Sequence, residues 1–158
     1  MVRLKSGDSG LFGRLEEEIT ALTKAGIDYE IIPGVTSAMA AAAAAGIPLT
    51  RRLTARRVQF VTGHDVTGSL PEDLNVAALA DPAATTVIFM GKRTFGELTR
   101  RLTDAGMSPD TPAILAESVS TPAQKIVRGT LLTMERLIAE EASDGPALIL
   151  LGPLADGK

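Results

Sequence analysis

The sequence predicts an α/β fold with a mixed, mostly parallel sheet flanked by helices. Short apolar runs rich in β-branched residues alternate with longer segments of helical periodicity. Two apolar runs between residues 113 and 128 follow each other with no helix between them, which predicts one hairpin in an otherwise parallel sheet. The 158 residues, 45% of them hydrophobic, are enough for one domain with a buried core.

The first third of the chain predicts two strands and two helices. Residues 2–5 are a candidate strand, and a turn rich in glycine and serine then leads into a helix over residues 11–24, whose early glutamates suit the helix dipole. Residues 29–32 are a second candidate strand. Thr36 or Ser37 caps the next helix, an alanine run that ends at a Gly-Ile-Pro sequence.

The rest of the chain continues the alternation. Strands are predicted at residues 58–62, 85–90, 113–116, 124–128 and 147–151. Helices are predicted at residues 74–80, 95–105 and 133–142.

Composition excludes several classes of protein. The net charge is −3 and aromatic residues make up 3%, so neither phosphate binding nor base stacking on nucleic acid is expected. No apolar stretch reaches the roughly 18 residues that a membrane span needs, and the first residues do not resemble a signal peptide, so we expect no membrane contact and a cytoplasmic location. The absence of cysteine removes disulfides and thiolate chemistry.

The first candidate site is the glycine-rich turn at residues 7–13. Its glycines follow the spacing G-x-x-G-x-x-G, which is not the G-x-G-x-x-G fingerprint of dinucleotide-binding folds. Such a turn lets a ligand approach the backbone, and Asp8 can face a cation. From the pattern alone, a plain tight turn is the commoner explanation.

Two further candidates lie where predicted elements begin or end. Thr36 and Ser37 stand at the start of the alanine helix, where free N–H groups and two hydroxyls can bind a polar ligand, although N-capping also explains them. Met90 ends the predicted strand 85–90, and ligands of open α/β sheets gather outside the carboxyl ends of strands. Packing in the core is the alternative for Met90.

Arginines and one histidine complete the candidates. Arg51, Arg52, Arg56 and Arg57 can clamp carboxylates with forked hydrogen bonds, or they can form a solvated surface. His64, the only histidine, suits either acid–base chemistry or a structural hydrogen bond. One histidine without cysteine is too few ligands for a metal site of that type, so no metal is expected.

Six motifs, taken together and in register, resemble the tetrapyrrole methylase family, and in particular its uroporphyrinogen-III C-methyltransferases. They match the family patterns R-L-K-x-G-D-P-x-x-F-G-R, P-G-[IV]-T-[SA], A-G-I-P-L-T, T-G-H, Y-M-G and G-T-L. The matching residues are 2–8 with 12–14, 33–37, 45–50, 62–64, 89–91 and 129–131. Ser9 replaces the usual proline of the first pattern, and Val119 stands where glycine is commoner.

The resemblance implies the C-terminal, S-adenosylmethionine-binding part of a two-domain methylase whose N-terminal domain is missing here. Residues 1–14 would be an interdomain strand and cofactor loop, and residues 15–158 the cofactor-binding α/β domain. The implied cofactor-binding residues are Gly7, Asp8, Leu11, Thr36, Ser37, Met90 and Val119. The catalytic residues would lie in the missing part, so none is named.

The activity implied is C-methylation of uroporphyrinogen III to precorrin-2, in sirohaem and cobalamin synthesis, with S-adenosylhomocysteine as the second product. Arg51 and Arg52 would then bind carboxylates of the tetrapyrrole substrate, and the enzyme would be a homodimer. One alternative is a later precorrin methylase of the corrin pathway. Another is a non-catalytic cofactor-binding or dimerisation module, and we expect this chain alone to be inactive.

Overall fold

Five strands form one sheet in the order β1-β2-β5-β3-β4. The structure is a computed structural model that describes residues 1–141 and 143–157. The strands are β1 (Arg57–Thr62), β2 (Ala84–Phe89), β3 (Pro112–Glu117), β4 (Lys125–Thr130) and β5 (Ala147–Leu151). The helices are α1 (Leu15–Lys24), α2 (Ser37–Ala45), α3 (Val76–Leu79), α4 (Phe95–Asp104), α5 (Leu131–Glu141) and the 3-10 helix η1 (Pro153–Asp156).

The sheet is mixed and flanked by helices, as predicted, but the expectation that it is mostly parallel is wrong. Only β1 and β2 pair in parallel, whereas the pairs β2–β5, β5–β3 and β3–β4 are antiparallel. The reason is that the last strand, β5, inserts between β2 and β3 and runs against both. The strands β1, β2 and β3 still share one direction, so their carboxyl ends lie at the same edge of the sheet.

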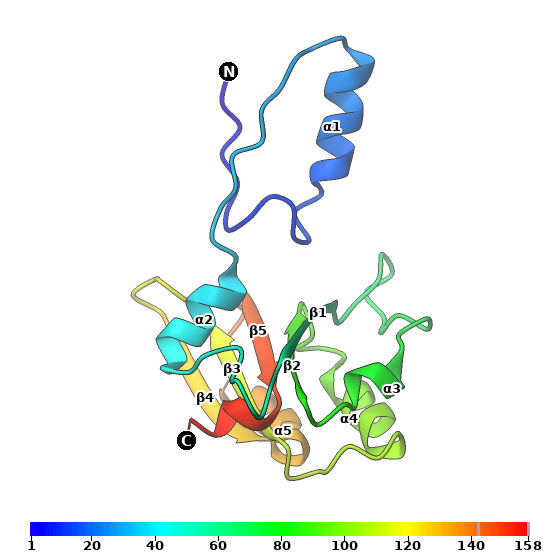
Figure 1. The fold of residues 1–158 in the computed structure, drawn as a ribbon, viewed down its shortest axis with the longest axis vertical. Helices are drawn as coiled ribbons and strands as arrows, with labels where there is room; N and C mark the ends of the chain where they lie inside the picture. The colour runs from blue at the N-terminus through cyan, green and yellow to red at the C-terminus, as the bar shows by residue number, and fades with distance from the viewer. Residues whose placement is uncertain (142, 158) are drawn as a thin grey trace.

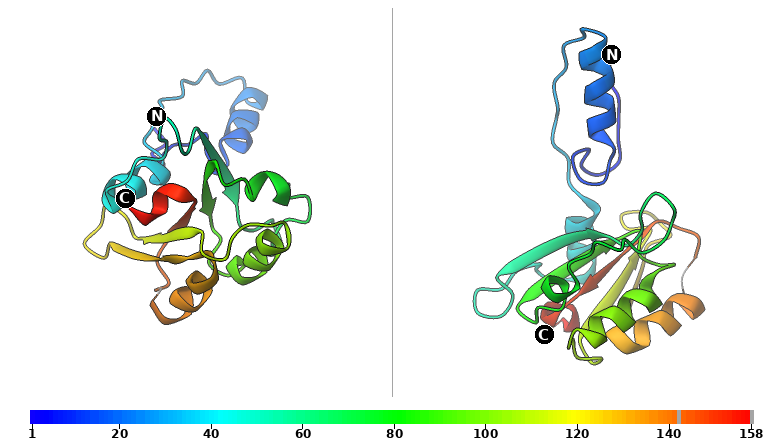
Figure 2. Two further views of the ribbon diagram at one scale, coloured as in Figure 1. Left: turned by 60° about the horizontal axis from the view of Figure 1, so that its bottom comes forward. Right: turned by 90° about the vertical axis from the view of Figure 1, so that its right-hand side faces the viewer.

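Each face of the sheet carries its own hydrophobic cluster. Alternate residues of β2 show the division, because Val87 belongs to the cluster under α2 and Ile88 to the cluster under α4. Figure 2 shows α4 and α5 side by side on one face, with α2 and η1 on the other. All six residues of β3 except Pro112 are buried, which explains the continuous apolar run that predicted this strand.

Helix α2 begins and ends as the sequence predicts. The Thr36 hydroxyl accepts the Ala38 amide hydrogen at 3.4 Å, and Gly46 ends the helix in a left-handed conformation. Ala38 and Ala41 are fully buried, so the small side chains bring the helix backbone close to the sheet.

The other predicted helices differ from the structure at their ends, and α3 and α4 are shorter than the predicted ranges 74–80 and 95–105. Helix α1 begins later than the predicted range 11–24, because Phe12 and Arg14 have positive φ angles of 53° and 56°. Helix α5 begins two residues before the predicted range 133–142, whose last residue lies outside the described residues.

Residues 1–35 form an arm that extends away from the packed body, which is formed by the described residues from 36 onward (Figure 1). The predicted strands at 2–5 and 29–32 are wrong, since both segments are extended but pair with no strand in the described chain. A strand needs a neighbouring strand for its hydrogen bonds, and the arm offers none. Helix α1, all of which is described, has no buried residue and lies in the arm. The predicted division after residue 14 stays a prediction.

Candidate functional site

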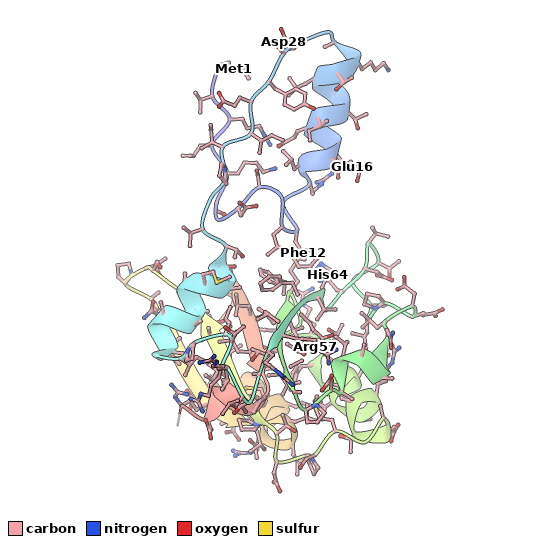
Figure 3. The ribbon with its side chains drawn as sticks, viewed as in Figure 1. Met1, Phe12, Glu16, Asp28, Arg57 and His64 are labelled. Carbon is pink, nitrogen blue, oxygen red and sulfur yellow. The ribbon has the colours of Figure 1, made fainter. Side chains whose placement is uncertain are left out.

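The candidate site lies where the arm meets the body. The glycine-rich loop at residues 6–13 reaches from the arm to the carboxyl ends of β1 and β2, and α2 begins beside it (Figures 1 and 3). We call this region the seam: it comprises the loop at residues 6–13, residues 34–37, and the ends of β1 and β2 with residues 63 and 89–91. Most of the predicted cofactor-binding residues lie in the seam, and four contacts define its geometry.

Asp8 ties the loop to the segment that precedes α2. One carboxylate oxygen, Oδ2, accepts the Gly34 amide hydrogen at 2.9 Å, and the other, Oδ1, accepts the Gly10 amide hydrogen at 2.9 Å. Both bonds fix the backbone of the loop, and they leave the negative charge of Asp8 at the seam. A carboxylate in this position therefore has a structural task in addition to any contact with a cation.

The two segments approach each other so closely that a side chain is excluded at Gly34. A Cβ atom built on Gly34 would overlap the carbonyl oxygen of Gly7. Gly7 itself has a φ of 71°, and the position of its own Cβ would lie 3.8 Å from the Ser37 amide nitrogen. The loop thus places Gly7 and Asp8 beside the segment from Gly34 to Ser37.

An aromatic contact joins the loop to the sheet. The ring of Phe12 lies 5.0 Å from that of Phe89, the last residue of β2, and Phe60 on β1 meets Phe89 at 6.2 Å in an edge-on geometry. These are three of the four phenylalanines of the chain. Sequence reasoning missed this cluster, although both Phe12 and Phe89 belong to the motifs that carried the resemblance.

The ends of β1 and β2 are packed backbone against backbone. A Cβ atom on Gly63 would overlap Gly91, and the Gly63 carbonyl accepts a hydrogen bond of 2.5 Å from the Thr94 hydroxyl. Met90, which directly precedes Gly91, has a φ of 55° and is 42% exposed. Met90 is therefore a surface residue at the sheet edge and not a core residue, which rules out the alternative of core packing.

Leu11 and Val119 complete the predicted set. Leu11 is half-buried in the loop, where its amide lies 3.4 Å from the Asp8 carbonyl oxygen. Val119 lies in the turn between β3 and β4 and packs, like Phe89, against the cluster under α2. Val119 and Phe89 are thus on the α2 side of the sheet.

Arg51 and Arg52 are not brought to this seam. They are exposed residues of a tight turn, in which Arg51 pairs with Ala55 before β1 begins. Strand β1 separates them from the carboxyl edge, and its six residues span roughly 20 Å at about 3.3 Å each. The structure therefore places the predicted substrate-binding arginines at the opposite end of the sheet.

His64 follows β1 at the carboxyl edge, and Figure 3 shows it below Phe12. Its carbonyl oxygen accepts a 2.9 Å hydrogen bond from the Thr62 hydroxyl. The next residue, Asp65, accepts the hydroxyl and amide of Thr67, and these bonds hold the pKa of the Asp65 carboxyl below its usual value. Among the described residues, no cluster of three or more His, Asp or Glu side chains can hold a metal ion.

The seam has a polar part, which includes closely packed glycine backbone, and an apolar part. Close glycine contacts, two hydroxyls at a helix start and one carboxylate form the polar part, and Phe12, Phe89 and Met90 form the apolar part. Such a site fits a ligand that combines a charged, hydrogen-bonding end with a flat ring system. None of the helices in the described residues is long and apolar enough to cross a bilayer.

A model of the family described as Tetrapyrrole (Corrin/Porphyrin) Methylases matches residues 1–135. A siroheme synthase of Chromobacterium violaceum is 45% identical over 99% of this chain, which spans 33% of that protein. A uroporphyrinogen-III C-methyltransferase of Synechocystis sp. is 40% identical over 99% of this chain, which spans 59% of that protein. The chain is therefore similar to a part of each of these longer proteins.

Solved structures share the fold. The uroporphyrin-III C-methyltransferase of Thermus thermophilus, in complex with S-adenosylhomocysteine, superposes with a TM-score of 0.83 and 32% identity over all of this chain and 68% of that one. A cobalt precorrin-4 methyltransferase has the same TM-score, 0.83, and 32% identity, over 92% of this chain and 61% of that one.

Proposed function

The chain belongs to the tetrapyrrole methylase family, and on that premise we propose that it supplies part of the S-adenosylmethionine site of a uroporphyrinogen-III C-methyltransferase. The reaction is methylation of uroporphyrinogen III at carbon to give precorrin-2. The relatives that are 45% and 40% identical to this chain over the matched residues are a siroheme synthase and a uroporphyrinogen-III C-methyltransferase, and both support this choice of substrate.

The observation that carries the proposal is the bond between Asp8 and Gly34. This single contact of 2.9 Å joins two motifs that are 26 residues apart, and the contact between Phe12 and Phe89 joins them to a third. Motifs with no common structural element thereby meet at one sheet edge. A shared ligand explains why these separate segments each carry glycine, hydroxyl or apolar groups there.

The residues of the seam divide into a polar and an apolar part, which suits the two ends of the cofactor. Gly7, Thr36 and Ser37 present amides and hydroxyls to the methionine end, while Met90 and Val119 flank the adenosine. The bound cofactor supplies an electrophilic methyl group on a sulfonium. The charge of Asp8 favours that cation electrostatically, and its two hydrogen bonds hold the loop in place.

Calorimetric titration with S-adenosylhomocysteine tests the proposal. We expect saturable binding to one site, and an affinity at least roughly tenfold lower for Asp8→Ala, because the two hydrogen bonds that hold the loop are lost. Asp81→Ala is the matched control, since the Asp81 carboxylate also accepts a backbone amide, from Ala83 at 2.7 Å, but lies before β2 at the opposite end of the sheet. Equal losses in the two variants would contradict a site at the seam.

A methylase that acts later in the corrin pathway remains the second candidate, because the cobalt precorrin-4 methyltransferase is as similar in fold as the uroporphyrin-III enzyme. Turnover of uroporphyrinogen III by the longer enzyme that contains this sequence would decide for the first candidate. A non-catalytic module is the third possibility. We expect the 158-residue chain to have no methyltransferase activity by itself, and measurable turnover would contradict that expectation. Homodimer formation and a cytoplasmic location stay predictions.

A further inference from the structure

A partly buried ion pair lies close in sequence to Met90 and Val119, the two residues that would flank the adenosine in the proposed cofactor site. Glu117, the last residue of β3, is 2% exposed, and its Oε1 lies 2.7 Å from the Nζ of Lys92. Lys92 follows Met90 by two residues, and Glu117 precedes Val119 by two residues. The pair therefore links the turn after β2 to the turn after β3.

A third segment, which contains Ser143 and Gly145 and precedes β5, forms hydrogen bonds with the same pair. The ammonium group of Lys92 also donates to the carbonyl oxygens of Ser143 and Gly145, at 2.5 and 2.8 Å. Glu117 accepts the Ser143 amide hydrogen at 2.9 Å on Oε2. Burial raises the pKa of the Glu117 carboxyl, but the hydrogen bonds from Lys92 and Ser143 outweigh burial and leave that pKa below its usual value.

The two turns that the pair joins contain strained residues. Met90 and Ser118 both have left-handed backbone conformations, with φ angles of 55° and 49°. Residues other than glycine stay in that region only where their surroundings hold them there. The Ser118 amide donates to the Pro146 carbonyl at 2.8 Å, so the chain entering β5 is held between the two turns.

We propose that Lys92 and Glu117 are positioning residues, which hold Met90 and Val119 apart as opposite walls of the cofactor site. β5 lies between β2 and β3, so the two walls stand two strand spacings apart, roughly 10 Å. That gap is wide enough for a flat heterocycle. The inference rests on the proposed function, because it assigns the pair to the cofactor site described above.

The simpler explanation is that the pair serves stability alone, and the variants are chosen to separate the two. Lys92→Met with Glu117→Leu removes both charges, so that neither is left buried without a partner. Lys125→Met is the matched control, because Lys125 also bonds a glutamate, Glu141, at 2.6 Å and its backbone carbonyl at 2.6 Å, but on an exposed surface. For each variant we would measure the melting temperature, the affinity for S-adenosylhomocysteine, and amide exchange at Ser118 and Ser143.

We expect the double variant to melt close to the unchanged chain, to bind S-adenosylhomocysteine roughly tenfold more weakly, and to exchange faster at Ser118 and Ser143. The control should change none of these. Normal affinity in a double variant with accelerated exchange would overturn the proposal, because the turns would then move without consequence for binding.

If the unchanged chain does not bind S-adenosylhomocysteine, the proposed function fails, and exchange still tests the positioning. Faster exchange confined to Ser118 and Ser143 in the double variant would then support a pair that holds the two turns. Unchanged exchange at both amides would overturn it.

Discussion

The body and the arm of this protein are stabilised in different ways. In the body, strands such as β2 and β3 are buried on both faces, and their conformation is supported by clusters of core side chains on either side. In the arm, Leu4 and Ile32 are 92% and 71% exposed, and no residue of α1 is buried in a helix that is wholly described. The arm therefore depends on a small number of polar contacts and on the aromatic contact between Phe12 and Phe89.

Those contacts lie where the arm is closest to the proposed site. Lys5 bonds the Gly13 carbonyl and, at 2.9 Å, the carboxylate of Glu18, and Asp8 bonds Gly34. Hydrogen bonds from Lys5 and Arg3 lower the pKa of the Glu18 carboxyl. Ion pairs near the protein surface contribute little stability, so the proposed site lies between a well-packed body and a weakly held arm.

The largest expected effect compares one isoleucine in each region. Ile149→Ala, in the centre of β5, removes a fully buried side chain and should lower the free energy of unfolding by about 2–5 kcal/mol. Ile32→Ala in the arm should change it by less than about 0.5 kcal/mol, because that side chain is already in water. Denaturant unfolding measures both, and a large loss for Ile32→Ala would mean that the arm is part of the cooperative core.

The next effect concerns the seam. Gly34→Ala places a methyl group on the Gly7 carbonyl oxygen, so the loop must move and the affinity for S-adenosylhomocysteine should fall by roughly tenfold or more. The body should melt at the same temperature. Gly26→Ala is the control within the arm: its φ of 65° strains an alanine, but among the described residues other than its chain neighbours no atom lies within 4 Å of the added Cβ, so it adds backbone strain to the arm without a clash at the loop. Equal affinities of the two variants for S-adenosylhomocysteine would show that the position of the loop does not affect binding.

A smaller effect should appear in acid, at Glu117 in the body. The pKa of Glu117 is lowered in the folded protein, so its contribution to stability is complete above the ordinary glutamate pKa and is lost as pH falls through the folded value. Glu117→Gln should therefore flatten the decline of the denaturation midpoint below about pH 4.3. Glu141→Gln should flatten the decline less, because Lys125 also lowers the pKa of the Glu141 carboxyl but at an exposed position where solvent screens the interaction, and equal flattening in both variants would argue against a special role for Glu117.

The smallest effect on the chain itself is expected at the far end of the sheet. Replacing Arg51 and Arg52 by alanine should change the unfolding free energy by less than about 0.5 kcal/mol and leave the affinity for S-adenosylhomocysteine unchanged. In an active methyltransferase that contains this sequence, the same change should raise KM for the tetrapyrrole if the proposed function holds and these arginines bind its carboxylates. A loss of cofactor affinity that equals the loss of substrate affinity would refute that role.

Local sequence patterns predicted most helices and strands of the body, because capping residues and runs of buried residues mark where these elements begin and end. Thr36 and Gly46 bound the alanine helix through their own backbone geometry, and residues 85–88 read as a strand because all of them are buried. Whether most strand pairs are parallel or antiparallel was not predictable, because it depends on the position that β5 takes in the sheet. The sequence of residues 147–151 does not indicate that position.

The arm shows where sequence patterns mislead. Residues 2–5 and 29–32 have the composition of strands, but a strand forms only beside another, and the described chain places none there. The predicted cofactor residues came from a resemblance, and the structure adds what the resemblance lacked: the bond from Asp8 to Gly34 and the aromatic contact of Phe12. Both are contacts between distant segments, which periodicity cannot reveal.

The most direct test of the central claim is hydrogen exchange of this chain with and without saturating S-adenosylhomocysteine. A cofactor site at the seam predicts slower exchange in residues 6–13 and at Ser37, Gly91 and Val119, with no change at residues 51–56. Protection confined to residues 51–56, or spread evenly over the body without the loop at 6–13, would contradict a site formed between the arm and the sheet.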